Sequence, residues 1–150
     1  MNTTPSPVGI PKILIADDNL VILKTISYAL KSAGYQPLTA ATTSEAITLA
    51  RKEHPDLILL DLNFPPDAGN IGGSLQDGLL ILEWLHRMGE AKETPVIIIS
   101  VTEPEKYKER AEAAGVAACL QKPIDNRQLL VAIQSVLHPA PAAGRADFEV

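Results

Sequence analysis

The sequence predicts an α/β fold, in which one five-stranded parallel sheet carries helices on both faces in a doubly wound (βα)5 sandwich. Two observations support this prediction. Strand-like apolar runs alternate with helix-like segments five times along the 150 residues. The runs at 12–16, 57–60 and 96–99 are almost continuously apolar, which is typical of strands covered on both faces. Open sheets of this kind bind ligands beyond the carboxyl ends of their strands.

Each expected element has its own local signal. Glycines end three of the helices, Pro37 makes the second strand an edge strand, and Thr42 and Glu45 have capping-box spacing. Pro104 marks a first helical turn, and Asp125 can cap the last helix. In chain order, we expect strands at 12–16, 35–40, 56–60, 95–100 and 116–121, and helices at 19–33, 42–54, 77–89, 103–115 and 125–137.

Composition limits the possible functions. Hydrophobic residues make up 46% of the chain and aromatics only 4%, which suits one domain with an aliphatic core. The net charge of −5 argues against unaided binding to nucleic acid or to anionic membranes. A single cysteine, Cys119, excludes an internal disulfide and favours a reducing, cytoplasmic location. We expect a flexible arm at 1–11, the domain at 12–138, and an Ala/Pro-rich tail or linker at 139–150.

Polar residues follow four of the predicted strands. They are Asp17 and Asp18, Asp61, Ser100, and the pair Lys122-Pro123. Each alone is most simply a cap or a turn residue. Because the carboxyl ends of parallel strands lie at one edge of a sheet, we expect these side chains to converge there.

The combined chemistry of these residues indicates phosphoryl transfer. Neighbouring carboxylates repel each other and suit Mg²⁺, which prefers oxygen ligands and also binds phosphate oxygens. A lysine adds a second positive charge, and a serine hydroxyl can donate to an incoming anion. A carboxylate held beside a cation and a lysine can attack a phosphoryl group.

These residues resemble the receiver domain of bacterial two-component response regulators, the CheY-like family. The resemblance covers residues 12–137. It rests on "ILIADDN" for the acidic pair, "LILLDLNFP" for the phosphoacceptor loop, "DG" at the start of the third helix, "IIIS" for the Ser/Thr switch and "LQKPI" for the lysine. The resemblance implies a flavodoxin-like sandwich with strand order 2-1-3-4-5 and, in place of an enzyme, a domain that catalyses only its own phosphorylation and dephosphorylation.

The resemblance also implies a role for each site residue. Asp18 and Asp61 would ligate Mg²⁺ directly, the backbone carbonyl of Asn63 would be the third ligand, and Asp17 would act through water. Asp61 would take a phosphoryl group from a histidine kinase or a histidine phosphotransfer protein. Ser100 and Lys122 would bind the new phosphate, and a downstream protein would recognise the shifted conformational equilibrium. A homodimer through the fourth to fifth helix face is a further possibility.

Two departures from the family pattern stand out. Cys119 occupies the position three residues before the lysine, where the family usually has an aromatic side chain that rotates on phosphorylation. Its simplest interpretation is a buried core thiol. The loop after Asp61 is longer than usual by an insertion at 66–76, which is either a solvated loop or a flap beside the site. Asn63 and Thr102 are candidate residues for tuning the phosphoryl lifetime.

Other functions are weaker alternatives. A haloacid-dehalogenase-type phosphatase also uses an aspartate, Mg²⁺ and a lysine, but its nucleophile follows the first strand. A nucleotide-binding domain would need a glycine-rich phosphate loop where Asp17 and Asp18 stand. A degenerate receiver that binds proteins without phosphorylation is the main alternative, and the complete set of site residues argues against it. The chain fits a single-domain regulator and a domain excised from a longer protein equally well.

Overall fold

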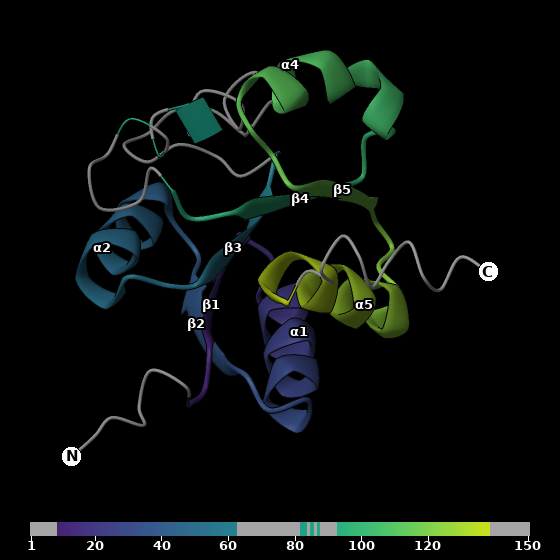
Figure 1. Ribbon diagram of the computed structural model, residues 1–150. Coiled ribbons are helices and arrows are strands. Elements are labelled where there is room, and N and C mark those ends of the chain that lie inside the picture. The colour runs from purple at the N-terminus through teal and green to yellow at the C-terminus, as the bar shows by residue number, and fades with distance from the viewer. Residues whose placement is uncertain (1–8, 63–81, 84, 86, 88–92, 139–150) are drawn as a thin grey trace, which may run out of the picture.

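The computed structural model describes residues 9–62, 82, 83, 85, 87 and 93–138. Their strands form one parallel sheet in the order β2-β1-β3-β4-β5, as predicted (Figure 1). The strands are β1 (Lys12–Ala16), β2 (Gln36–Ala40), β3 (Leu57–Asp61), β4 (Val96–Ser100) and β5 (Ala118–Gln121). Strand β2 pairs only with β1 and is therefore an edge, in agreement with the proline inside it.

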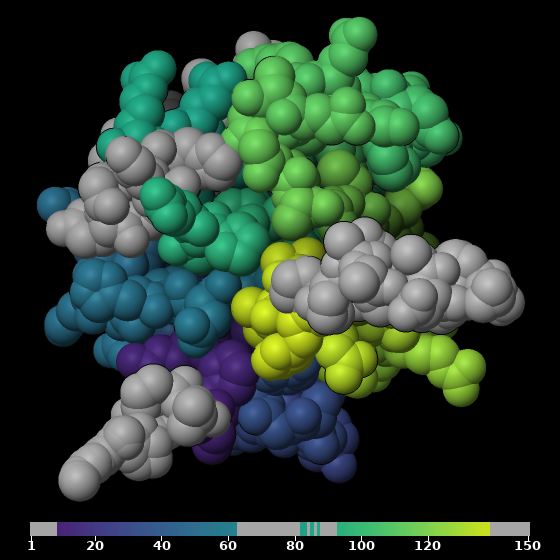
Figure 2. All heavy atoms as spheres, in the orientation of Figure 1, coloured from purple at the N-terminus to yellow at the C-terminus, as the bar shows by residue number. Residues whose placement is uncertain are grey.

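Helices cover both faces of the sheet. Helices α1 (Leu20–Ser32) and α5 (Asn126–Leu137) lie on one side, whereas α2 (Thr43–Glu53) and α4 (Lys108–Ala113) lie on the other (Figure 1). In the space-filling view, the surface of α4 (green) lies above that of α5 (yellow) (Figure 2). Alternate residues of the buried strands feed two separate hydrophobic clusters, one on each face. This arrangement explains why the central strands are apolar at every position.

Local sequence signals account for the helix starts. The Asn19 side chain accepts hydrogen bonds from the Val21 and Ile22 amides, at 2.9 and 3.2 Å, and caps α1. Thr42 Oγ1 caps α2 by accepting from the Glu45 amide at 3.1 Å. The reciprocal bond of the capping box differs slightly, because Glu45 accepts from the Ala41 amide instead of the Thr42 amide.

The expected fourth helix at 103–115 is wrong as a continuous helix. A short 3₁₀ helix, η2 (Pro104–Lys106), is followed by α4, and Tyr107 separates the two with φ −135° and ψ 3°. The Tyr107 side chain is only 2% exposed and belongs to the hydrophobic cluster on this face. Burying this ring takes precedence over the helical backbone that the surrounding charged residues favour. Gly115 ends the segment with φ +84°, a conformation that favours glycine.

Several sequence predictions lie outside the described residues. They are Asn63, the insertion at 66–76, most of the helix at 77–89, and the tail at 139–150. Leu82 and Leu85 of that helix are described, and both are buried. At the other end of the chain, the Pro11 carbonyl accepts from the Gln36 amide at 2.9 Å. Among the described helices, none is both long and apolar enough to cross a membrane.

Candidate functional site

Three carboxylates meet at the carboxyl edge of the sheet. Asp17 and Asp18 follow β1, and Asp61 is the last residue of β3. Their nearest carboxylate oxygens all lie within 4.8 Å of one another. Asp17 is fully buried, Asp61 is 4% exposed, and Asp18 is exposed to solvent. Buried like charges this close repel each other strongly and need a compensating cation.

Lys122 provides part of that compensation. Its Nζ lies 2.8 Å from Asp17 Oδ2 and 3.6 Å from Asp61 Oδ2, with only 13% of the lysine side chain exposed. Its amide donates to the Ser100 carbonyl at 2.8 Å, which places the lysine beside the end of β4. The Lys122-Pro123 peptide bond is cis. The lysine therefore links the end of β5 to Asp17, which follows β1, and to Asp61 at the end of β3.

Hydrogen bonds hold Asp17 from two sides. Its Oδ1 accepts from the Asn19 amide at 2.9 Å, while Oδ2 accepts from Lys122. Its own amide donates to the Ala40 carbonyl at 3.1 Å. Both oxygens of Asp17 thus have protein partners, whereas Asp18 beside it is open to solvent.

Ser100 ends β4 at the same edge and is fully buried. The Thr102 amide donates to Ser100 Oγ at 3.1 Å, which closes a small turn just beyond the strand. A hydroxyl can accept this bond and still donate its own hydrogen elsewhere. The position of the Ser100 side chain is therefore linked to the start of the β4–α4 connection.

Cys119 lies on β5 opposite Ile98, in the register that places Gln121 opposite Ser100. It is partly buried, and burial raises the pKa of its thiol although the Tyr107 hydroxyl acts in the opposite direction. Burial also raises the pKa of Tyr107, and the neighbouring Cys119 adds to that increase. The thiol therefore stays protonated near neutral pH, which agrees with the core interpretation of this residue.

The proximity of Tyr107 to Cys119 was not predicted from the sequence. Within the described part of the chain, the tyrosine hydroxyl is buried without a partner at hydrogen-bonding geometry, although it is close enough to the thiol to affect its pKa. A single aromatic within a strongly charged segment was the available signal. An aromatic side chain is more stable when it is buried in a hydrophobic cluster than when it is exposed on the solvated face of a helix.

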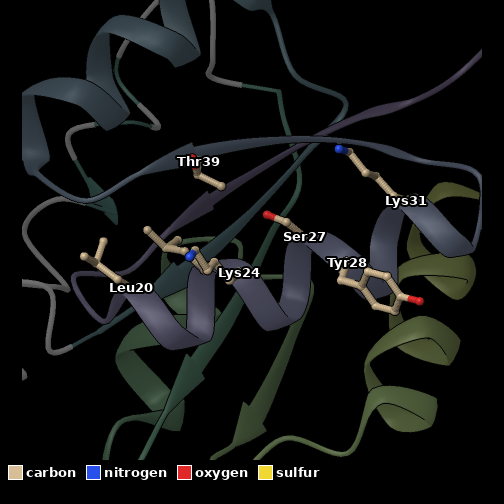
Figure 3. A pocket seen from close by; sticks show the side chains of 7 residues that line it. Leu20, Lys24, Ser27, Tyr28, Lys31 and Thr39 are labelled. Atoms are coloured by element: carbon tan, nitrogen blue, oxygen red, sulfur yellow. The ribbon is translucent and has the colours of Figure 1, made fainter.

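Apolar side chains and shallow hollows surround the site. Leu20, Val21 and Val101 follow β1 and β4 and are 65%, 70% and 64% exposed. A hollow of about 180 Å³ lies between α1 and the β5–α5 connection and includes Lys122 in its lining. A larger hollow of about 460 Å³ runs along α1 and β2, with Lys24 and Lys31 beside Tyr28 (Figure 3). Neither hollow contains the carboxylates, which stand at the open edge of the sheet.

Comparisons with known proteins agree with this geometry. Residues 13–134 match the response regulator receiver domain family. The chain is 30% identical over 128 residues to the polar-differentiation response regulator DivK of Brucella ovis, covering 85% of this chain and 97% of that protein. The chemotaxis response regulator CheY4 of Vibrio cholerae has 32% identity and a TM-score of 0.73, with 85% of this chain and 99% of that chain covered. A CheY-like receiver domain protein from Methanospirillum hungatei has 26% identity and the same TM-score, over 86% and 94% of the two chains. The chain thus belongs to the response regulator receiver domain family of two-component signalling proteins.

Proposed function

We propose that this receiver domain is an active phosphoacceptor and that Asp61 takes the phosphoryl group. The observation that supports this most directly is the placement of Asp61, nearly buried close to two other aspartates and with its Oδ2 3.6 Å from Lys122 Nζ. A lone surface aspartate would have neither the cation nor the neighbouring oxygens that phosphoryl transfer needs. The same placement argues against the alternative of a degenerate receiver that only binds proteins.

The donor set fits Mg²⁺. Three carboxylates lie within 4.8 Å of one another, and among the described residues Lys122 is the one lysine paired with them, so a net negative charge remains that a hard divalent cation would balance. Asp18 and Asp61 would hold the ion directly, Asp17 would act through water, and the Asn63 carbonyl would be a further ligand. When bound, the ion supplies positive charge that stabilises the transferred group.

The transfer itself is a simple displacement. One Asp61 carboxylate oxygen forms a bond to phosphorus while the bond from phosphorus to the donor breaks. With acetyl phosphate the electron pair leaves on acetate, and with a phosphohistidine it leaves on the imidazole, which then takes a proton from solvent. The Lys122 ammonium group would form an ion pair with the acyl phosphate, and the Ser100 hydroxyl would donate a hydrogen bond to a phosphate oxygen. Thr102 and Asn63 would limit the approach of water.

A protein with a phosphorylated histidine is the proposed donor, either a histidine kinase or a phosphotransfer protein. The exposed Leu20 and Val21 border the carboxylate edge and suit an apolar contact with such a partner. The changed conformation would then be recognised by a downstream protein, with a homodimer through the α4 to α5 face as one form of output. Nucleic acid and membranes are not proposed as direct partners, and a cytoplasmic location stays a prediction.

The proposal is tested by incubating the protein with acetyl phosphate and Mg²⁺ and measuring its intact mass. We expect one phosphoryl adduct, and we expect no adduct with Asp61→Asn or after removal of Mg²⁺ with EDTA. Asp56→Asn is the matched control, because Asp56 also lies next to β3 but at its opposite end, where it accepts from the Lys12 amide. A wild-type protein that stays unmodified would support the degenerate receiver.

Partner docking gives a second prediction. Replacing Leu20 and Val21 together by alanine should slow transfer from a phosphohistidine protein about tenfold, since apolar contact area is lost at the edge of the interface. The rate with acetyl phosphate, which needs no docking, should be unchanged. Val131→Ala on α5 is the control, because Val131 is similarly exposed at 57%. Equal slowing with both phosphate donors would show that the double variant damages the site itself.

A further inference from the structure

Tyr107 has an unusual environment for a tyrosine. Its side chain is 2% exposed, and its hydroxyl has no partner at hydrogen-bonding geometry among the residues that the structure describes. A buried hydroxyl without a partner is unfavourable, whereas the same hydroxyl in water would be fully hydrogen-bonded. The ring also interrupts the helical segment, since η2 ends and α4 begins on either side of it. The buried position of Tyr107 is therefore held against two local preferences.

The segment that holds Tyr107 in place begins at Ser100. Residues 101–106 connect the end of β4 to the tyrosine, and the Thr102 amide near their start is bonded to Ser100 Oγ at 3.1 Å. On the far side, the Tyr107 amide donates to the Pro104 carbonyl at 3.1 Å. The hydrogen bond from the Thr102 amide to the Ser100 hydroxyl is thus one of the bonds that fix the conformation of the connection leading to the ring.

Cys119, the neighbour of Tyr107, borders a hollow. This hollow of about 330 Å³ is lined by residues of η2, α4 and β5, with Cys119 in its wall. Its rim carries the exposed residues Glu105, Lys108 and Glu112, so that a hydroxyl reaching it would find water and charged partners. In the observed position, Tyr107 instead lies against the thiol and shares the hydrophobic cluster with which Cys119 packs.

We propose that Tyr107 couples the side-chain orientation of Ser100 to the conformation of the surface formed by α4 and β5. When Ser100 Oγ turns toward a phosphoryl group on Asp61, the Thr102 amide loses its acceptor, residues 101–106 change conformation, and Tyr107 moves outward and uncovers Cys119. The inference rests on the proposed function, because it needs an anion on Asp61 to recruit Ser100. It assigns the response to phosphorylation to Tyr107, which lies between η2 and α4. The position on β5 where the family usually has an aromatic side chain is occupied by Cys119 in this chain.

Cys119 provides the test, because it is the only cysteine of the chain. Its reaction rate with 5,5′-dithiobis(2-nitrobenzoate) is measured with Mg²⁺ alone and with Mg²⁺ plus acetyl phosphate, and intact mass is followed in parallel. We expect the thiol to react about tenfold faster in the phosphorylated protein, since a partly buried thiol reacts faster in states that expose it further. Asp61→Asn should show no acceleration.

Two variants separate this role from a merely structural one. Tyr107→Phe keeps the ring but removes the unpartnered hydroxyl, so the thiol should stay slow and lose most of its acceleration. Tyr107→Ala should make the thiol fast with or without acetyl phosphate. Tyr28→Phe is the control, because the Tyr28 side chain is 75% exposed on α1, and it should behave as wild type.

The outcomes distinguish this inference from the proposed function. A phosphoryl adduct without faster labelling overturns the inference and leaves Asp61 as the phosphoacceptor. Equal acceleration in wild type and Tyr107→Phe overturns the part assigned to the hydroxyl. Absence of the adduct overturns the proposed function and this inference with it.

Discussion

Lys122→Met is expected to destabilise the metal-free protein by about 3 kcal/mol, because it leaves a fully buried carboxylate without its cation. Asp17 is 0% exposed, and Lys122 Nζ is 2.8 Å from its Oδ2. Breaking one side of such a pair costs more than the pair itself contributes, since the remaining charge keeps its desolvation penalty. Because 13% of the lysine side chain is exposed, we expect a loss at the lower end of the roughly 3–5 kcal/mol that breaking a buried ion pair costs.

Mg²⁺ should reverse part of this loss. A divalent cation beside Asp18 and Asp61 gives the remaining carboxylates a new counter-charge, so the gap between variant and wild type should narrow when Mg²⁺ replaces EDTA. The measurement is urea unfolding under both conditions, with the free energy of unfolding compared for each protein. Phosphorylation by acetyl phosphate should also be much slower in the variant, because a charge close to the transferred group is missing.

Lys12→Met is the matched control for this experiment. Lys12 Nζ lies 3.3 Å from Glu53 Oε1, but both side chains are 36% exposed. An ion pair with that much solvent contributes only about 0.5 kcal/mol, and Mg²⁺ has no reason to change its effect. If Lys122→Met loses no more stability than Lys12→Met in EDTA, the Lys122–Asp17 contact does not have the importance assigned to it.

The features that sequence predicted well are those determined by local chemistry and by the rules of parallel sheets. Thr42 and Asp125 cap their helices, as predicted, through bonds that span three and two residues. The gathering of Asp17, Asp61, Ser100 and Lys122 follows from strand direction alone, because the carboxyl ends of parallel strands share one edge. The strand order was implied by the family resemblance and is confirmed.

The features that sequence missed depend on contacts between distant residues. Lys122 and Asp17 are separated by 105 positions, and nothing near either residue indicates that the lysine bonds Asp17 more closely than Asp61. The interruption at Tyr107 has a similar cause, since helix propensity describes the backbone of 103–115 but not the hydrophobic cluster that receives the ring. Tertiary burial decided the conformation there.

Asp61→Asn should have opposite effects on stability with and without Mg²⁺. In EDTA, the attraction between Asp61 and Lys122 at 3.6 Å is about 5 kcal/mol at an effective dielectric near 20. Repulsion from Asp17, within 4.8 Å, is about 3 to 4 kcal/mol on the same scale and nearly cancels it. The desolvation of a carboxylate that is 4% exposed and the further repulsion from Asp18 also disfavour the charged form of Asp61. Asparagine removes the desolvation penalty of the charge and the repulsion from Asp18, so the variant should be about 1 kcal/mol more stable than wild type in EDTA.

In saturating Mg²⁺ the order should reverse, because the ion stabilises the wild type by about 2.7 kcal/mol at a concentration one hundred times its dissociation constant. The variant lacks one of the carboxylates that would hold the ion and should gain much less. Urea unfolding of both proteins in EDTA and across a Mg²⁺ titration measures the crossing directly. Asp56→Asn, at the opposite end of β3, should show no dependence on Mg²⁺ beyond that of wild type. Two parallel stability curves for wild type and Asp61→Asn would mean that Asp61 is not a metal ligand, whatever its role in phosphorylation.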